Sequence, residues 1–328
     1  MKIGIAGSGM IVSYVLDVWK NFEDIEVTAI WCREQNIDTA SDIAKEYSIA
    51  NVYTDYNEFL NDDSFDFVYI GLVNSLHYEY SKAALNARKS VVCEKPFTST
   101  GEQAKELLEC AKQNNVFVFE SCLPWYSDNY EEVKRLLPEI GEVKLIECSF
   151  SQYSRRYESY LNGDILPVFD PSLDGGALYD LGVYSVHFIM GLVGIPKDVQ
   201  YFPNIGFNGI DTSGVLVMNY DGFKGVCMTA KDCSAPSRCV IEGNKGCIVI
   251  DSHPGEIKNI TLRMNGESPV NKDIIEFSEG FKYIYEKIIA ITKANDYKKC
   301  YEMMDKVIDV MNVMEDARKG AGIKFSCD

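Results

Sequence analysis

The chain has 328 residues, which at about 150 residues per domain corresponds to roughly two domains. Hydrophobic residues make up 46% and charged residues 25%, as in ordinary globular proteins, so a disordered or low-complexity chain is excluded. The 32 basic and 49 acidic residues give a net charge of -17, and no Lys/Arg cluster breaks this acidic background. We therefore expect no nucleic-acid partner and no anionic membrane partner, because phosphate binding needs a basic face.

The N-terminal residues, the apolar stretches and the cysteine spacing bear on cellular location and metal binding. The N-terminal residues lack the charged leader and apolar core of a secretory signal, and no apolar stretch approaches the roughly 20 residues that span a bilayer. The 11 cysteines include no CxxC pair, and the chain has only 3 histidines, so the spacing of a zinc site is missing. We expect a cytosolic protein with structural thiols and no metal site.

The first part of the chain alternates short apolar runs with segments of helical periodicity. Strands are predicted at Lys2–Ala6, Val27–Trp31, near Val52, Phe67–Leu72, Ser90–Cys93 and Val116–Glu120. Helices are predicted from Met10 and at Thr39–Tyr47, Asn57–Leu60, Tyr78–Ala87 and Gly101–Gln113. This alternation is typical of βαβ units, so residues 1–121 should form an α/β domain with a doubly wound parallel sheet.

After Glu120 the rhythm changes to strands joined by short turns. A helix at Asn129–Leu137 precedes strands at Glu142–Tyr153, Val215–Tyr220, Gly222–Lys231, Ser237–Glu242 and Gly246–Ser252, and helices near Gly280–Thr292 and Tyr297–Lys319 close the chain. Asp221-Gly222 and Asn244-Lys245-Gly246 are typical of hairpin connections. Residues 122–328 should therefore form an α+β domain with a large, mostly antiparallel sheet and helices on one face. The other face needs cover, which favours a homodimer or homotetramer joined sheet to sheet.

A glycine turn follows the first predicted strand. Gly7-Ser8-Gly9-Met10-Ile11-Val12 has the first two glycines of the dinucleotide fingerprint, with Val12 in place of the third. Gly7 permits the tight turn, and Gly9 lets the backbone approach a pyrophosphate held at the helix N-terminus. Val12 should shift the helix slightly without abolishing binding. The alternative is a turn with no ligand, but the position after the first strand of a βαβ array is the context that the motif requires.

The end of the second strand bears on the choice of cofactor. NAD-selective domains usually place an acidic residue there, whereas this chain has Cys32 followed by Arg33. A guanidinium can grip a 2′-phosphate through paired hydrogen bonds and stack on adenine, so we favour NADP over NAD. Two alternatives stay open: Arg33 is a solvated loop charge, or Glu34 reaches the ribose and allows NAD.

Lys95 follows a predicted parallel strand, within Glu94-Lys95-Pro96. Ligands of doubly wound sheets bind at the carboxyl ends of the strands. A lysine held there beside an oxidised nicotinamide would have a lowered pKa, which suits a proton donor or acceptor. The plain alternative is a surface lysine before a loop proline.

A second candidate group lies in Asp174-Gly175-Gly176 and the helix predicted after it. Asp180 and Tyr184 are four residues apart, so both side chains should leave the same face of that helix. A carboxylate and a phenol on one face can hold two oxygens of a polyhydroxylated substrate. The alternative is a helix-capping polar residue and a partly buried tyrosine.

Together these segments resemble the glucose-fructose oxidoreductase/inositol dehydrogenase (Gfo/Idh/MocA) family. The resemblance runs essentially the whole length, through the glycine turn, Val73-Asn74-Ser75-Leu76-His77, Glu94-Lys95-Pro96, the strand end with Glu120 and GGALYDLGVYSVH. It implies a Rossmann domain followed by an α+β domain. Tyr184 looks like the glucose-fructose oxidoreductase and dihydrodiol dehydrogenase branch rather than inositol dehydrogenase. Two departures concern the cofactor loops, namely Val12 and Val73, which stands where the family commonly has proline.

The resemblance also implies site residues. It places Lys95, Asp180 and Tyr184 at the substrate beside the nicotinamide, and it makes the peptide bond before Pro96 cis. The implied cofactor-binding residues are Gly7, Gly9, Met10, Ile11, Cys32, Arg33, Asn74, His77, Glu94, Lys95 and Glu120.

Aromatic and guanidinium side chains before Asp180 suit the faces and hydroxyls of sugars. Trp125 and Arg156, together with Arg155, Tyr157 and Phe169, are therefore further substrate-side candidates, although Arg155 and Arg156 could equally be an exposed basic pair.

Two function classes remain. The first is an NAD(P)-dependent dehydrogenase or reductase that moves a hydride between the nicotinamide and a carbinol carbon of a sugar, polyol or diol. The second is a non-catalytic NAD(P)-binding regulator or sensor that keeps the same fold, since fold alone does not establish function. The joint presence of Lys95, Asp180 and Tyr184 favours the enzyme.

Overall fold

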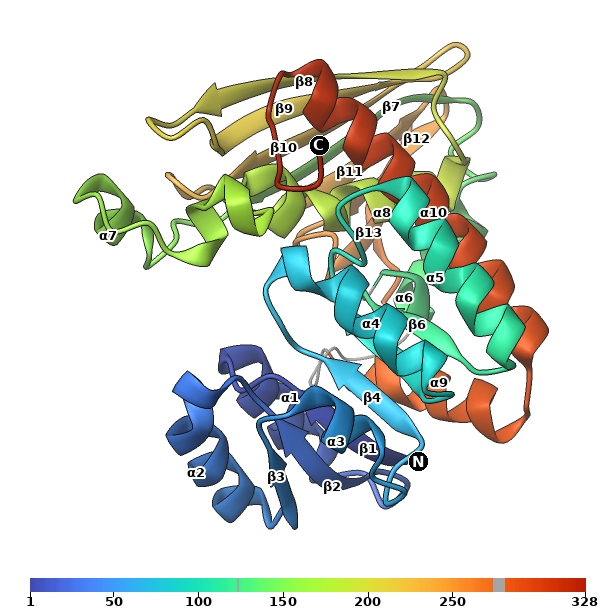
Figure 1. Ribbon diagram of the computed structural model, residues 1–328. Helices are drawn as coiled ribbons and strands as arrows, with labels where there is room; N and C mark the ends of the chain where they lie inside the picture. The colour runs from blue at the N-terminus through green and yellow to red at the C-terminus, as the bar shows by residue number, and fades with distance from the viewer. Residues whose placement is uncertain (123, 274–280) are drawn as a thin grey trace. The chain divides into compact units, whose positions relative to one another are not determined.

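The computed structural model describes residues 1–122, 124–273 and 281–328 (Figure 1). The chain divides into two compact units. The first comprises Met1–Ser121 and Phe281–Ile308, and the second comprises Cys122–Gly280 and Asp309–Asp328. The division falls inside the helix α10 (Tyr297–Gly320), which therefore contributes residues to both units.

A 6-stranded sheet forms the centre of the first unit, in the order β3-β2-β1-β4-β5-β6. All its described strand pairs are parallel, which confirms the predicted doubly wound sheet. β4 and β5 are buried along their whole length, which explains the continuous apolar sequence of β4 and the apolar centre of β5. The strands are β1 (Lys2–Ala6), β2 (Glu26–Trp31), β3 (Asn51–Tyr53), β4 (Phe67–Ile70), β5 (Ser90–Glu94) and β6 (Val118–Ser121).

Helices connect these parallel strands, as crossovers between parallel strands require. They are α1 (Met10–Trp19), α2 (Ile37–Tyr47), α3 (Tyr56–Leu60), α4 (His77–Asn86) and α5 (Gly101–Asn114), and they lie close to the predicted positions. The strand order changes direction at β1, which has β2 on one side and β4 on the other. Such a switch point is where doubly wound sheets bind their ligands.

The observed division differs from the expected domains, 1–121 and 122–328, in the segment Phe281–Ile308. This segment contains α9 (Lys282–Lys293) and the first part of α10, and the residue before it, Gly280, lies outside the described residues. Tyr285 of α9 packs edge-on against Trp19 at 5.1 Å, and Tyr297 of α10 stacks on Phe117 at 4.1 Å. Further along α10, Tyr301 donates a hydrogen bond to a carbonyl of α5, beside which α10 runs (Figure 1). These contacts cover Trp19 and Phe117, which are both buried, and so add α9 and the first part of α10 to the core of the first unit.

An 8-stranded sheet forms the second unit, in the order β14-β13-β12-β11-β7-β10-β9-β8. The pair β7–β10 is parallel and the other described pairs are antiparallel, as predicted for a mostly antiparallel sheet. Its strands are β7 (Val143–Ser151), β8 (Asp198–Ile205), β9 (Asp211–Asn219), β10 (Lys224–Ala230), β11 (Arg238–Gly243), β12 (Gly246–Ile250), β13 (Ile260–Met264) and β14 (Val270–Asn271). The sequence analysis did not predict β8, β13 and β14.

Helix α8 (Val183–Val193) packs against β7 and β10 on one face of this sheet. The inward residues Ile146 and Cys148 of β7 and Phe188 of α8 are fully buried, and burying an apolar side chain of this size stabilises the fold by about 1.5–3 kcal/mol. The remaining helices of the unit are α6 (Asp128–Leu136) and α7 (Tyr157–Leu161).

Among the described residues, the helical stretch Pro171–Val193 is long and apolar enough to cross a membrane. However, 72% of its most apolar part is buried inside the protein, as in a core helix.

All 11 cysteines lie among the described residues and are free thiols. All except Cys233, Cys247 and Cys327 are buried. Cys148 lies beside Cys227 on one neighbouring strand and beside Cys239 on the other. Burial raises the pKa of the Cys148 thiol well above its ordinary value, so these thiols behave as small apolar side chains of the core.

Candidate active site

The glycine turn links β1 to α1 in the first unit. Gly7 has a φ of 124°, and a Cβ there would overlap the Gly71 carbonyl oxygen, so both conformation and space require glycine. A Cβ on Gly9 would have no atom of residues 1–122, 124–273 or 281–328 within 4 Å. Gly9 is the N-cap of α1 and provides no side-chain cap for the first N–H groups of the helix. The turn thus leaves an open helix N-terminus, which is the geometry that binds a phosphate.

Val12 occupies the position of the third fingerprint glycine, where helix and strands pack closely. The side chain is fully buried, and space for it comes from Gly71, whose hypothetical Cβ would lie 3.0 Å from a Val12 methyl group. The close packing of α1 on the sheet therefore depends on a glycine after β4, Gly71, instead of a glycine on α1. Met10 and Ile11, the neighbouring cofactor candidates, are exposed and partly exposed respectively.

Cys32 and Arg33 follow β2, and the structure separates their roles. Cys32 is buried, and burial raises the pKa of its thiol, so this side chain stays neutral and inside the protein. Arg33 is exposed in an extended conformation just before the short helical turn Glu34–Asn36. Only Arg33 of this pair offers an accessible side chain to a ligand.

His77 lies between two loops at the carboxyl ends of the strands. It is fully buried, with Nδ1 2.8 Å from the Pro96 carbonyl oxygen and Nε2 3.2 Å from the Leu72 carbonyl oxygen. Burial lowers the pKa of this imidazole, and the two carbonyl acceptors partly oppose that shift. His77 therefore connects the loop after β4, where Asn74 begins a helical turn, to the loop after β5.

Lys95 follows β5 directly and is partly exposed. The Lys95–Pro96 bond is cis, as predicted. Glu94 is buried beside it and accepts a 2.7 Å hydrogen bond from the Tyr69 hydroxyl, and burial raises the pKa of this carboxyl. On the other side, the Phe97 N–H donates a 2.9 Å hydrogen bond to the buried carboxylate of Glu120. Glu94, Glu120 and His77 thus surround the backbone on both sides of Lys95.

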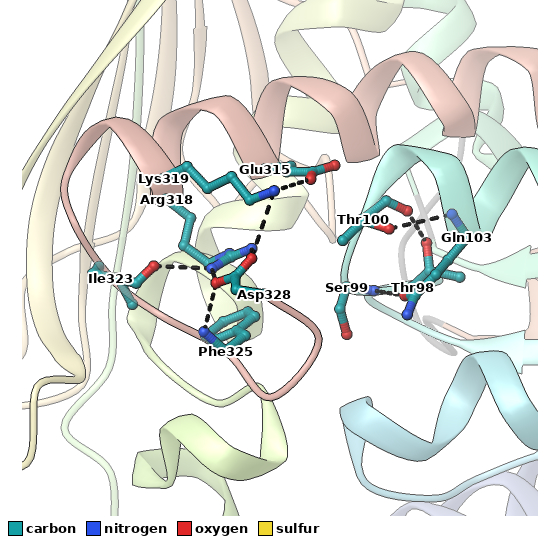
Figure 2. Close-up of polar contacts among 10 residues, drawn as sticks. All are labelled: Thr98, Ser99, Thr100, Gln103, Glu315, Arg318, Lys319, Ile323, Phe325 and Asp328. Atoms are coloured by element: carbon teal, nitrogen blue, oxygen red, sulfur yellow. Dashed lines mark hydrogen bonds and ion pairs between the residues drawn. The ribbon is translucent and has the colours of Figure 1, made fainter.

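The chain after Pro96 is also held by side-chain hydrogen bonds (Figure 2). Thr100 caps α5 by accepting a 3.2 Å hydrogen bond from the Gln103 N–H, and Gln103 accepts one of 3.1 Å from the Ser99 N–H. Thr98 donates a 2.8 Å hydrogen bond to the Thr100 carbonyl oxygen. This reciprocal capping fixes the start of α5 and so the loop that begins with Lys95.

In the second unit, Asp180 and Tyr184 stand out by their accessibility. From Asp174 to Met190 every residue is buried except these two, which are partly exposed. The structure corrects the predicted regular helix, because Leu178–Gly182 forms a π-helical turn before α8. The Val183 N–H bonds to the Leu178 carbonyl, five residues back, so the turn is one residue wider than in an α-helix. Apolar spacing cannot distinguish the two kinds of turn.

Lys231 forms an ion pair with Asp180 that the sequence analysis missed. Lys231 follows β10, and its side chain is 7% exposed compared with 29% for that of Asp180. The buried ammonium therefore holds the carboxylate from inside while part of the carboxylate remains accessible. A lone lysine after a strand provides no sequence signal for this pairing, because Asp180 is 51 residues away.

Asp211 at the start of β9 is a second residue that the sequence analysis missed. Its carboxylate is 2% exposed and accepts hydrogen bonds of 2.7 Å from both the Leu178 N–H and the Tyr201 hydroxyl. Burial raises the pKa of this carboxyl, and the hydrogen bond from Leu178 opposes the shift. Gly176 has a φ of 105°, and a Cβ there would overlap the Asp211 carboxylate. Asp211 thus caps the turn that bears Asp180.

Two aromatic rings lie near Tyr184. Phe150 of β7 has its ring centre 6.0 Å from that of Tyr184, and His253, after β12, lies at 6.4 Å. His253 stacks on Phe150 at 4.3 Å, and its Nδ1 accepts a hydrogen bond from the Gly255 N–H. The phenol therefore stands beside a packed aromatic pair, a surrounding that the sequence analysis did not foresee.

The remaining substrate candidates differ in their surroundings. Trp125 is partly exposed and donates a 2.9 Å hydrogen bond to the His187 carbonyl oxygen on α8. Arg155 and Arg156 are both exposed just before α7. Phe169 is fully buried and packs against Tyr160, so it supports this region from inside.

Comparison with known proteins identifies the family. The model of an oxidoreductase family with an NAD-binding Rossmann fold matches residues 1–121, and the model of the GFO/IDH/MocA C-terminal domain matches residues 130–249. The chain belongs to the Gfo/Idh/MocA oxidoreductase family. The predicted family and fold class are confirmed, and the first unit contains an NAD-binding Rossmann fold.

Several known proteins are similar to this chain over all or nearly all of its length. The scyllo-inositol 2-dehydrogenase (NADP(+)) IolU of Bacillus subtilis is 31% identical over 100% of this chain and 99% of its own. A trans-1,2-dihydrobenzene-1,2-diol dehydrogenase of Danio rerio is 26% identical over 93% of this chain and 92% of its own. The crystal structure of the 3-ketoreductase KijD10 from Actinomadura kijaniata with NADP and TDP-benzene has a TM-score of 0.84 at 20% identity, covering 99% of this chain and 98% of that one. This last likeness shows the fold.

Proposed function

We propose that this protein is an NADP-dependent dehydrogenase or reductase that transfers a hydride between the nicotinamide and a carbinol carbon of a sugar, polyol or diol. The observation that carries the proposal is the accessibility of Asp180 and Tyr184 on a segment whose other residues are buried. Residues 1–121 would hold the cofactor, and residues 122–328 would supply most of the substrate contacts. The names of the inositol and dihydrodiol dehydrogenase relatives support a small polyhydroxylated substrate.

The residues of the first unit fit a dinucleotide. The free N-terminus of α1 at Gly9 suits the pyrophosphate, and the exposed Arg33 suits a 2′-phosphate. Asn74 and Lys95 lie at the ends of β4 and β5, on the side where ligands of such sheets bind. Buried His77, Glu94 and Glu120 would act by shaping the loops around the nicotinamide.

In this proposal the protein orients the substrate and moves a proton. Bound NADP accepts or supplies the hydride. Tyr184 exchanges a proton with the substrate oxygen, and the Lys95 ammonium binds that oxygen and favours the phenolate. Asp180, held by Lys231, accepts a hydrogen bond from a second hydroxyl of the substrate.

A turnover screen tests the function. Sugars, sugar phosphates, inositols and diols are offered with NADP and with NAD, and nicotinamide absorbance is followed beside cofactor binding by calorimetry. We expect turnover of at least one polyhydroxylated class with NADP. Cofactor binding without turnover across every class would support the regulator instead.

Arg33→Ala tests the choice of cofactor. A charge-assisted hydrogen bond contributes about 1.5–3 kcal/mol, so we expect the Kd for NADP to rise roughly tenfold to a hundredfold. The Kd for NAD, which lacks the 2′-phosphate, should change little. Arg263→Ala removes an exposed guanidinium of the second unit and serves as the control. Equal weakening of both cofactors would remove the role assigned to Arg33.

We also infer a homodimer or homotetramer formed through the face of the 8-stranded sheet that α8 does not cover. Val217, Val226 and Val240 are partly exposed in one row across this face, with Glu147 between the last two. Such an apolar row on a broad sheet suits packing against a second sheet.

The buried free cysteines support a reducing compartment, and we propose the cytosol.

Val226→Glu tests this interface. It puts a second carboxylate beside Glu147 and would bury it between two sheets, which opposes association. Light scattering at micromolar concentration should give at least twice the chain mass for the unmodified protein and the mass of one chain for the variant. Ile195→Glu, at an exposed position outside the sheet, should keep the oligomer. A monomeric unmodified protein would refute the interface.

A further inference from the structure

The residues that follow α10 fold back on that helix and form a small closed loop. We define Ile323–Asp328 as the C-terminal loop. Arg318, on the last turn of α10, is fully buried and donates hydrogen bonds to the Ile323 carbonyl oxygen at 2.9 Å and to both carboxylate oxygens of Asp328 (Figure 2). The guanidinium also lies over the Phe325 ring, 4.3 Å from its centre. Within the loop, the Phe325 N–H donates a 2.9 Å hydrogen bond to Asp328.

The same loop touches the segment that leads to Asp180. The Ser326 N–H and hydroxyl donate hydrogen bonds of 3.4 Å and 3.3 Å to the buried carboxylate of Asp174. Phe325 meets the Tyr179 ring edge-on, with the ring centres 4.7 Å apart. The loop therefore contacts the segment at both ends of Asp174–Tyr179, and Tyr179 is the residue immediately before Asp180.

This segment needs external support. Asp174 has a φ of 57°, a conformation that is unfavourable for a residue with a side chain. Gly175 and Gly176 follow it, and glycine loses more conformational freedom on ordering than any other residue. The π-helical turn at Leu178–Gly182 comes next. Asp211 holds the segment at Leu178, whereas the C-terminal loop holds it at Asp174 and Tyr179.

We infer that the C-terminal loop is a positioning element of the active site, which holds Asp180 and Tyr184 in place through Asp174 and Tyr179. The inference rests on the proposed function, since it takes Asp180 and Tyr184 as substrate-side residues. Arg318 is the centre of this arrangement, because one buried guanidinium joins the helix, the loop backbone and the Asp328 carboxylate. None of the loop residues needs to touch substrate for the loop to affect turnover.

Asp328→Asn and Ser326→Ala in the full chain test the inference. Asp328→Asn removes the charge that Arg318 holds, and Ser326→Ala removes the hydroxyl that Asp174 accepts while leaving the Arg318–Asp328 pair intact. A displacement of about 1 Å in a catalytic group can cost a hundredfold in rate, so we expect kcat to fall about tenfold or more in Asp328→Asn and about threefold in Ser326→Ala. The Kd for NADP should stay within about twofold, because the cofactor residues belong to the other unit.

Hydrogen–deuterium exchange supplies a readout that does not need turnover. Amides of residues 174–184 should exchange faster in both variants, and Asp221→Asn, which breaks an exposed ion pair with Lys197 in the same unit, should leave kcat and exchange unchanged. If Asp328→Asn does not fold, Ser326→Ala decides the question. Unchanged exchange at 174–184, or lower thermal stability with unchanged kcat, would overturn the positioning role. Faster exchange in the variants of a protein that turns over no polyhydroxylated substrate would instead overturn the proposed function.

Discussion

Lys95→Ala and Tyr184→Phe are each expected to lower turnover by about two orders of magnitude or more, a loss typical of removing a general acid or base. A phenol has an ordinary pKa of about 10, too high for a base near neutral pH unless a nearby cation favours the phenolate. Lys95 would be that cation. Because the two residues would act together in the same proton transfer, the double variant should be little slower than either single variant.

Stopped-flow and steady-state measurements with the best substrate of the screen check this expectation. Binding of NADP should remain within about threefold in both single variants, since neither change removes the helix N-terminus at Gly9. Turnover close to that of the unmodified enzyme in Tyr184→Phe would transfer the proton role to Lys95 alone. The same result in both variants would reject this active site.

Asp211→Ala is expected to destabilise the second unit by roughly 2–6 kcal/mol. The change leaves the buried Leu178 N–H and the Tyr201 hydroxyl without their acceptor, and each orphaned buried group costs about 1–3 kcal/mol. Asp180 follows Leu178 by two residues, so turnover should fall with stability. Urea unfolding followed by circular dichroism measures the loss.

Tyr201→Phe is the matched control for this experiment. It removes one donor and leaves the Asp211 carboxylate bonded to the Leu178 N–H, so we expect a loss of about 1 kcal/mol and near-normal turnover. If Asp211→Ala were no more destabilising than Tyr201→Phe, the cap at Leu178 would contribute little to the fold.

The parallel sheet of the first unit and the helices between its strands could be predicted from the sequence because their signals are local. Each strand of the parallel sheet is a short apolar run, and each helix between strands shows its own periodicity. The strand β8 was missed for the opposite reason. It lies at the edge of its sheet and is mostly exposed, and Pro203 argues against a strand although Val199, Tyr201 and Phe202 have high β-propensity. β13 and β14 have five and two residues and depend on pairing for their shape.

The candidate active site likewise contains residues that the sequence reveals and residues that it does not. Lys95, Asp180 and Tyr184 belong to short motifs, and reading them required only their neighbours in the chain. Lys231 and Asp211 act on the Asp180 turn from 51 and 33 residues away, and nothing around either residue indicates its partner. The π-helical turn was hidden because nearly every residue around it is buried, so no one-sided apolar pattern reveals the extra residue in the turn. Val12 departs from the motif, and the compensating Gly71 follows another part of the sheet, the strand β4.

The first unit consists of two segments that are separated in the sequence by most of the second unit, and this affects how the protein folds as it is synthesised. Its sheet is complete at Ser121, yet Tyr285 and Tyr297 cover its aromatic side chains only after the strands of the second unit have been made. At 5–20 residues per second, translation of the intervening 160 or so residues takes roughly 10 seconds or more. During that interval Trp19 and Phe117 lack their final partners, so the nascent chain exposes apolar surface that a chaperone could bind. A ribosome-bound chain whose residues 1–121 have all left the exit tunnel should therefore be a better chaperone substrate than the complete protein.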